Sequence, residues 1–205
     1  MKLYTSVGPN PHVVRMFVAE KGMDIDRVPI DLPGGENRRE PFLSLNPSGT
    51  SPILALPSGQ VICEILPICE YLEEVHPEPV LIGRTPEERA ETRMWSRRID
   101  LGLAEPMTNA FRSCEARGLF ENRRPILSSE AGEELKAMAR QYLLWLDGQW
   151  QGRQFVCGDR FTLADVMLFA FLDFGEHVGQ PIPQEAAWVR DWYGRVKARP
   201  STTAE

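Results

Sequence analysis

The chain has 205 residues, of which 42% are hydrophobic and 25% are charged, and its formal net charge is −6. This composition is typical of a soluble protein, and the length allows one large domain or two small ones. The negative net charge argues against nucleic acid or an anionic membrane as a partner, and the longest apolar run, 166–172, is too short to cross a bilayer.

The first third of the chain alternates short strand-like and helix-like segments. Val13, Val14, Phe17 and Val18 recur at helical spacing, and Pro29 restricts its strand to the edge of a sheet or to a bulge. Strands are expected over 2–6, 26–32, 52–56 and 60–64, and helices over 12–22, 40–49 and 64–77. The predicted order is βαβαββα, which is that of a small α/β domain.

A proline-rich linker is expected at 78–84, and an all-helical domain follows it. Thr85, Pro86 and Glu88 have the pattern of a capped helix start, and Thr162 with Asp165 forms a similar cap before a nearly continuous apolar run. Helices are expected over 88–114 with a bend at Pro106, and over 128–150, 162–177 and 184–200. The predicted domains are therefore 1–77 and 85–205, and the helix over 162–177 should be the buried central one.

The cysteines and histidines do not indicate a metal site. No two cysteines form a C-x-x-C pair, and the three histidines do not cluster with them. Scattered thiols favour a reducing compartment, in which they act as small buried hydrophobes. The N-terminus shows no secretory signal, so we expect a cytoplasmic protein that holds no metal. The cysteines are Cys63, Cys69, Cys114 and Cys157.

Four motifs in this order resemble the cytosolic glutathione transferase superfamily, and the resemblance covers essentially the whole chain. They are "NPSGTSPIL" at 46–54, "CEILPICEYLEE" at 63–74, "RFTLADVML" at 160–168 and "VRDWYGRVKARPS" at 189–201. The resemblance implies a thioredoxin-like N-terminal domain and an all-helical C-terminal domain. It also implies a cytoplasmic homodimeric detoxification enzyme with glutathione as co-substrate.

Within the superfamily, the chain is most similar to atypical fungal-type transferases and their bacterial relatives, which lack the usual Tyr, Ser or Cys activator. The similarity lies in the turn "GPNPHVVR" at 8–15 and in "GENRREPFLSLNPSGTSP" and "RRIDLGLAEPMTNAFRS" further along. Bacterial β-etherases are similar around "ICEYLEEVHPE" and "RAETRMWSRRID". Ether or halide compounds are therefore among the expected substrates.

The resemblance implies a set of glutathione-binding residues. Ser51 precedes Pro52, whose peptide bond is cis in the family, and its backbone would pair with the cysteinyl part of glutathione. Glu64 and the helix start at Ile65 would hold the γ-glutamyl ammonium and carboxylate. Most members have Ser or Thr where this chain has Ile65, which removes one hydrogen bond of about 0.5–1.5 kcal/mol. Asn37 and Arg39, together with Arg38, lie where the family reaches the glycyl carboxylate.

Three residues are candidates for activating the thiol of glutathione. Asn10 lies where other bacterial classes carry a catalytic cysteine or asparagine, and its amide could donate to a thiolate; alternatively it serves the turn and caps the helix behind Pro11. Thr108 and Arg112 match a hydroxyl and a histidine that hold a water in the atypical subgroup, and their spacing places them on one helix face. Alternatively, Thr108 bonds its own helix and Arg112 faces solvent.

The leading hypothesis is a transferase that adds glutathione to a small apolar electrophile or displaces a leaving group from it. Met107 and Phe111 are candidates for lining the electrophile pocket. A different reading is a non-catalytic glutathione-binding or interaction module, which Ile65 and the missing activator favour. A glutathione-dependent disulfide reductase is a third reading, and the lack of a cysteine near Asn10 counts against it.

Overall fold

The computed structural model describes residues 1–204, which form two compact units. The first unit consists of Met1–Ile82 together with the segment that begins at Pro200, and the second consists of Gly83–Arg199. Residues 78–82, expected in a linker, and the end of the chain, expected in the helical domain, thus belong to the first unit.

The first unit has the order βαβαββα, as predicted. Its elements are β1 (Lys2–Thr5), α1 (Pro9–Glu20), β2 (Asp26–Pro29), the 3-10 turn η1 (Glu36–Arg38), α2 (Phe42–Leu45), β3 (Ile53–Ala55), β4 (Val61–Cys63) and α3 (Ile65–Val75). The sheet order is β2-β1-β3-β4, with β2 parallel to β1 and the other two neighbouring pairs antiparallel. Pro29 therefore lies on an edge strand, where its missing N–H breaks no ladder.

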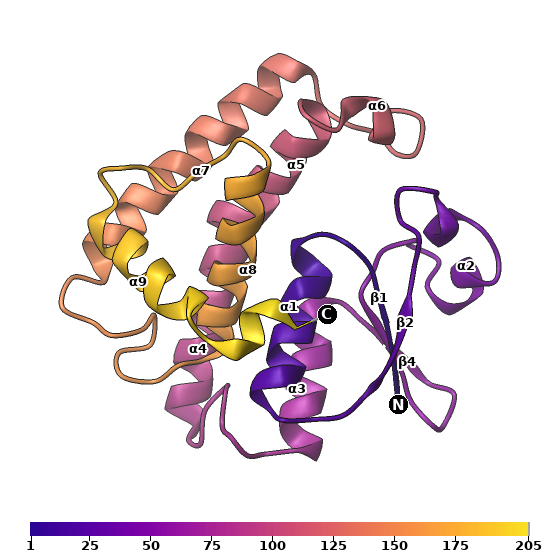
Figure 1. Cartoon of the computed structure of the whole chain (residues 1–205), viewed down its shortest axis with the longest axis horizontal. Helices are drawn as coiled ribbons and strands as arrows, with labels where there is room; N and C mark the ends of the chain where they lie inside the picture. The colour runs from indigo at the N-terminus through magenta and orange to yellow at the C-terminus, as the bar shows by residue number, and fades with distance from the viewer. Residues whose placement is uncertain (205) are drawn as a thin grey trace. The chain divides into compact units, whose positions relative to one another are not determined.

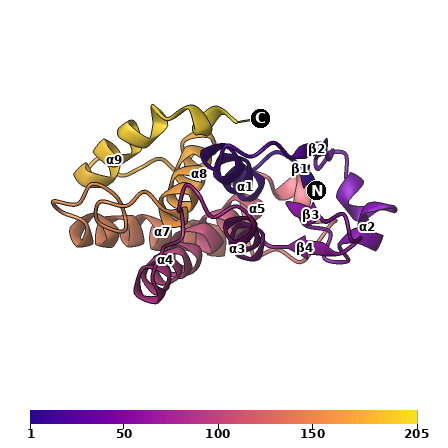
Figure 2. The same ribbon diagram turned by 90° about the horizontal axis from the view of Figure 1, so that it is seen from below.

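The alternation of side chains along the strands divides the core of this unit into two layers. Tyr4 and Ile53 are paired across β1 and β3 and pack with Phe42 of α2. Their neighbours Leu3 and Leu54 are paired as well, are fully buried and point to the other face of the sheet. Figure 2 shows α1 and α3 on that face and α2 on the opposite side.

A buried ion pair fixes the chain that follows α3. Lys21 and Glu73 form this pair, and each residue is only 2% exposed. The Lys21 ammonium also donates to the carbonyls of His76, Pro77 and Pro79, while the Glu73 carboxylate accepts from the N–H groups of Leu81 and Ile82. The pair thus satisfies the backbone of 76–82 and explains why these residues stay with the first unit.

The last segment of the chain packs on α1. The 3-10 turn η3 (Pro200–Thr203) follows the helical unit, and the His12 ring lies 2.9 Å from the carbonyl of Thr202. Arg15 donates to the carbonyl of Ala204 at 3.1 Å, and also to the Thr5 hydroxyl and the Ser6 carbonyl. Arg15 therefore joins the end of β1, the start of α1 and the terminal segment.

The second unit is helical (Figure 1). Its elements are α4 (Pro86–Ile99), the π-helical segment η2 (Asp100–Ala104), α5 (Glu105–Ser113), α6 (Arg117–Phe120), α7 (Ser129–Gln149), α8 (Leu163–His177) and α9 (Ala187–Lys197). Every residue from Leu163 to Leu172 is buried, so α8 is the central helix as predicted. No helix within residues 1–204 is both long and apolar enough to span a membrane.

The expected bend at Pro106 takes the form of a π-helical turn before it. The proline has no N–H, so the helical hydrogen bonds are rearranged in the preceding turn, and η2 replaces one turn of regular α-helix there. Gly102 lies within η2, and a Cβ on it would lie 2.4 Å from the ring of Tyr142 on α7. The glycine thus allows α7 to approach this turn closely.

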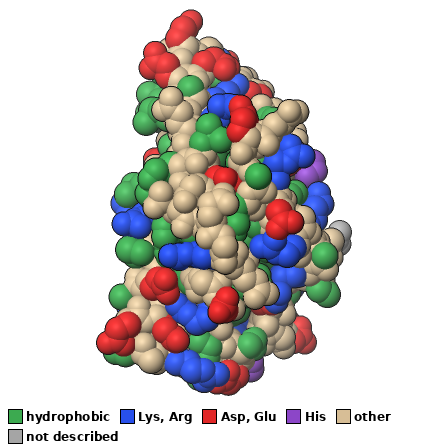
Figure 3. All heavy atoms as spheres, turned by 90° about the vertical axis from the view of Figure 1, so that its left-hand side faces the viewer, with side chains coloured by type: hydrophobic (Ala, Val, Ile, Leu, Met, Phe, Trp, Pro, Cys, Tyr) green, Lys and Arg blue, Asp and Glu red, His purple; other side chains and the backbone are tan. Residues whose placement is uncertain are grey.

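The surface of the helical unit is mixed in charge. On the face that Figure 3 shows, lysine and arginine side chains lie interspersed with aspartate and glutamate. Several charged side chains of this unit form pairs, such as Arg140 with Glu185 and Lys136 with Glu115 and Glu133. Exposed pairs of this kind stabilise the fold by only about 0–1 kcal/mol each.

Candidate functional site

The turn between β1 and α1 is built around Gly8. Gly8 has a φ of 108°, which side chains other than hydrogen rarely allow, and it is the residue before the helix. Pro9 follows at the first helical position, where a missing N–H breaks no bond. The helix thus begins at residue 9 and not at the expected 12. Asn10 lies within its first turn, so the interpretation of Asn10 as a cap behind Pro11 is wrong.

Asn10 remains a possible donor to a ligand. It is half-buried, and its amide makes no hydrogen bond to the residues that the structure describes. The first turn of a helix also carries a partial positive charge. In α1, Asn10 supplies the N–H group without an intrahelical partner, since Pro9 and Pro11 have no N–H. A negative group beside this turn would therefore be stabilised by both.

The segment before β3 is a tightly held loop. Asn46 donates to the carbonyl and hydroxyl of Thr50 and accepts from Ser48, which closes the turn. The amide of Asn37 donates to the carbonyl of Gly49 at 2.6 Å. The loop ends in Ser51, which is only 8% exposed, and the bond to the following proline is cis, as the resemblance implied.

The residues expected to reach a glycyl carboxylate lie around η1. Asn37 is 6% exposed and uses its amide to hold Gly49, so it positions the loop from within. Arg38 reaches the same loop through the carbonyl of Ser48. Arg39 is exposed and donates to the carbonyls of Gly34 and Gly35, on its own side of the turn.

Glu64 has an unusual backbone conformation. Among residues 1–204 it is the only non-glycine residue with a positive φ, 71°, combined with a ψ of 146°. Such a conformation costs about 1–3 kcal/mol and is concentrated at binding sites. Glu64 directly precedes α3, and its side chain does not cap that helix. The N–H groups that begin α3 thus directly follow an exposed glutamate.

The helical unit positions the other candidates on α5. The Thr108 hydroxyl donates to the carbonyl of Ala104 at 2.8 Å, so it bonds its own helix. Arg112 donates to Asn109 and lies over the ring of Phe120, at 5.9 Å from its centroid. No hydrogen bond joins Thr108 to Arg112 in the described part of the chain.

The two residues expected to line an electrophile pocket have different surroundings. Phe111 is half-buried and packs edge-to-face against Phe174 and Phe120, with ring centroids 5.0 and 6.4 Å apart. Met107 is 1% exposed and belongs to the interior of the helical unit. The structure therefore places Phe111, but not Met107, in a partly exposed aromatic cluster.

The thiols of the chain are poor nucleophiles. Burial raises the pKa of all four cysteines, and that of Cys157 rises to about 11. A raised pKa leaves the thiol protonated near neutral pH, whereas the thiolate is the reactive form. The described residues also contain no cluster of three or more His, Cys, Asp or Glu side chains suited to a metal ion. A thiolate at this site would thus come from a bound ligand.

Comparison with known proteins decides the family. Residues 7–75 match the model of the glutathione S-transferase N-terminal domain, and residues 129–195 match that of the C-terminal domain. Glutathione S-transferase 2 of Saccharomyces cerevisiae is 34% identical over 199 residues, which cover 96% of this chain and 85% of the yeast protein. The chain belongs to the glutathione S-transferase family.

Solved structures of similar fold agree with this assignment and cover nearly all residues of this transferase chain. The crystal structure of Gtt2 from Saccharomyces cerevisiae has a TM-score of 0.91 and 33% identity, covering 98% of each chain. That of a glutathione S-transferase domain-containing protein from Marinobacter aquaeolei has a TM-score of 0.92 and 36% identity, covering 99% of this chain and 100% of the other. The thioredoxin-like first unit and the helical second unit are thus those of the family.

In this transferase, Ser6 contacts Ser51 of the candidate site, although no sequence motif singles out Ser6. Its hydroxyl lies 2.5 Å from that of Ser51, although 45 residues separate the two. The register of β1 and β3 explains the contact: Tyr4 pairs with Ile53, so two residues further on Ser6 lies opposite Ser51. A register derived from the two hydrophobic strands could have revealed the pair.

We predict that Ser6→Ala raises the KM for glutathione about 2- to 10-fold with little change in kcat. The substitution removes a neutral hydrogen bond that orients Ser51, and such bonds contribute about 0.5–1.5 kcal/mol. Steady-state kinetics with varied glutathione test this. Ser58→Ala is a matched control, because Ser58 is exposed in the turn between β3 and β4. An unchanged KM in Ser6→Ala would show that Ser51 needs no such support.

Proposed function

We propose that this transferase holds glutathione on its first unit and stabilises the thiolate for attack on a small hydrophobic electrophile. The observation that carries the proposal is the conformation of Glu64. A strained glutamate immediately before a helix that it does not cap is explained if the side chain and the helix start together serve a ligand.

The γ-glutamyl end of glutathione suits this position. Its carboxylate would accept from the N–H groups that begin α3, where the helix dipole favours negative charge. Its ammonium would donate to the Glu64 carboxylate, in a charge-assisted hydrogen bond. Ile65 supplies only its backbone N–H, so the carboxylate has one hydrogen bond fewer than with Ser or Thr at that place.

The remaining parts of glutathione would extend along the loop before β3. Its cysteinyl backbone would pair with Ser51, which the Asn46 turn and the Ser6 hydroxyl hold in place. Its glycyl carboxylate would meet the cationic side chains of Arg38 or Arg39. Asn37 would act by holding Gly49.

Activation of the thiol requires hydrogen-bond donors or positive charge near the sulfur, since a free thiol has a pKa of about 8.5. Asn10 is the favoured donor, because its amide is not engaged by the described residues and lies in the first turn of α1. Thr108 would contribute only as an acceptor while it donates to Ala104, and Arg112 only through its charge. Arg112 would therefore stabilise the thiolate electrostatically and would not remove the thiol proton.

The chemical step would be nucleophilic. The thiolate sulfur forms a bond to an electrophilic carbon, and the electron pair of the broken bond leaves with a halide or alkoxide or moves onto an activated alkene. The aromatic cluster of Phe111, Phe120 and Phe174 favours an apolar electrophile. We further infer that the enzyme acts in the cytoplasm as a pair of identical chains.

Titration of bound glutathione by ultraviolet absorbance of its thiolate tests the proposal. We expect a thiol pKa at least one unit lower than in free glutathione, each unit corresponding to about 1.4 kcal/mol. Asn10→Ala should abolish most of this shift, and Thr108→Val and Arg112→Gln should abolish less of it. S-methylglutathione, which has no thiol, is the control for absorbance of the protein.

The same titration separates the transferase from a non-catalytic module of this fold. Binding of glutathione with an unshifted thiol pKa would favour the module, and absence of binding would overturn both. A shift that only Arg112→Gln removes would instead transfer the activating role from Asn10 to the helical unit.

A further inference from the structure

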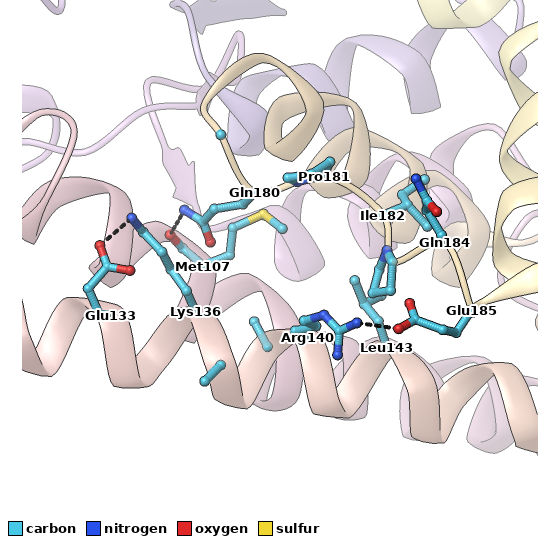
Figure 4. Close-up of a pocket in the computed structure, with 14 residues that line it drawn as sticks. Met107, Glu133, Lys136, Arg140, Leu143, Gln180, Pro181, Ile182, Gln184 and Glu185 are labelled. Atoms are coloured by element: carbon cyan, nitrogen blue, oxygen red, sulfur yellow. Dashed lines mark hydrogen bonds and ion pairs between the residues drawn. The ribbon is translucent and has the colours of Figure 1, made fainter.

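A cavity lies within the helical unit, and its lining includes none of the residues proposed to bind glutathione. It has a volume of about 800 Å³ and lies between α7 and the segment 179–185 that joins α8 to α9 (Figure 4). Its lining combines seven apolar side chains, among them Met107, Leu143, Pro181 and Ile182, with six charged or amide side chains. Cavities of about 300–1,000 Å³ are typical of small-molecule sites.

One polar group in the wall of this cavity is unsatisfied. Gln180 is 9% exposed, and its Nε2 donates to the Met107 carbonyl at 3.2 Å. This hydrogen bond identifies the nitrogen end of the amide. Its oxygen Oε1 is buried and accepts no hydrogen bond from the described residues. A buried acceptor without a donor destabilises the fold. Gln180 lines the cavity, and because its last side-chain torsion has a broad energy profile, a small rotation would bring Oε1 to a donor there while Nε2 keeps its bond to Met107.

The charges at the rim of the cavity are paired. Figure 4 shows Arg140 directed at Glu185 and Lys136 at Glu133. Lys136 is also paired with Glu115, which lies outside the cavity lining. With each cation matched by a carboxylate, the rim favours neither an anion nor a cation. The unsatisfied oxygen of Gln180 favours a ligand that donates a hydrogen bond.

We propose that this cavity binds a flat, uncharged, mostly apolar compound that donates one N–H or O–H to Gln180 Oε1, such as an indole or a phenol. The apolar side chains would cover the ring, and the hydrogen bond would fix its orientation. The site is distinct from the proposed catalytic residues, since its lining includes neither Phe111, Thr108 nor Arg112. Met107, expected from the sequence to line the electrophile pocket, lines this cavity.

Calorimetric titration of the intact protein with indole and with 1-methylindole tests the proposal. The two probes differ in the N–H, and we expect indole to bind about 3- to 10-fold more tightly, which corresponds to one neutral hydrogen bond. In Gln180→Met, which lacks the acceptor, the preference should vanish. Ala137→Trp should block the cavity and weaken both probes at least 10-fold, because Ala137 is an exposed residue at its rim.

Met138→Trp is the matched control, because Met138 is 58% exposed on the same helix and does not line the cavity. It should bind both probes as the unmodified protein does. Ala137 and Met138 are both exposed, so these two variants should fold even if Gln180→Met does not. The proposal is overturned if indole does not bind, if Ala137→Trp binds it normally, if 1-methylindole binds equally well, or if benzoate binds more tightly than indole.

Discussion

Glu64→Gly is expected to weaken glutathione binding about 10- to 100-fold while making the protein more stable. The substitution removes the charge-assisted hydrogen bond proposed between Glu64 and the glutathione ammonium, and bonds of this kind contribute about 1.5–3 kcal/mol. It also places glycine where φ is 71°, which relieves strain of about 1–3 kcal/mol at a cost of about 0.5–1 kcal/mol in chain entropy. Calorimetry with glutathione and chemical unfolding measure the two effects.

Glu64→Gln is the control for this prediction. It keeps the strained backbone and loses only the charge, so binding should weaken while the free energy of unfolding stays within about 0.5 kcal/mol of the original value. Opposite signs for binding and stability in Glu64→Gly are the decisive result, since they show that the strain is retained for the ligand. Normal glutathione binding by Glu64→Gly would remove Glu64 from the site.

The second large effect is a change in the free energy of unfolding with pH, which results from ionisation of Asp165. This carboxylate is fully buried at the start of α8 and accepts hydrogen bonds from Val156, Thr162 and Trp192. Burial raises its pKa to about 6, although the hydrogen bonds act in the opposite direction. The desolvation of the charge therefore exceeds the stabilisation by its partners.

A raised pKa in the folded state means that the folded protein holds the proton more tightly than the unfolded chain does. The contribution of Asp165 to stability is thus complete below about pH 4 and is lost as the pH rises through about 6. The loss amounts to about 3 kcal/mol, since each pKa unit corresponds to about 1.4 kcal/mol.

Asp165→Asn isolates this effect, because asparagine does not ionise. Unfolding by urea between pH 4 and pH 7 should show the stability advantage of the original protein over the variant falling by about 3 kcal/mol. Exposed carboxylates titrate equally in both proteins and cancel in the difference. An advantage that grows with pH would show that the hydrogen bonds to Asp165 outweigh its burial.

Much of the fold follows from short-range patterns in the sequence. Apolar spacing in the first third predicts the order βαβαββα. The missing N–H of Pro29 predicts an edge strand or a bulge, and the structure has the edge strand. The Thr162–Asp165 cap predicts the start of the buried helix, since both partners lie within one turn. The sequence misplaces the start of α1, because prolines such as Pro9 and Pro11 are compatible both with a connecting turn and with a first helical turn.

The sequence by itself determined the identity and order of the elements and the motifs of the proposed glutathione site, because each depends on residues a few positions apart. Only the tertiary structure decided which distant groups meet. Ser6 meets Ser51 through strand register, and Lys21 meets Glu73 from two different helices. Gln180 is left with an unsatisfied oxygen because packing on Met107 uses only its amide nitrogen. Such contacts join residues that lie tens of positions apart in the sequence. They depend on how the elements pack, which a local sequence pattern does not predict.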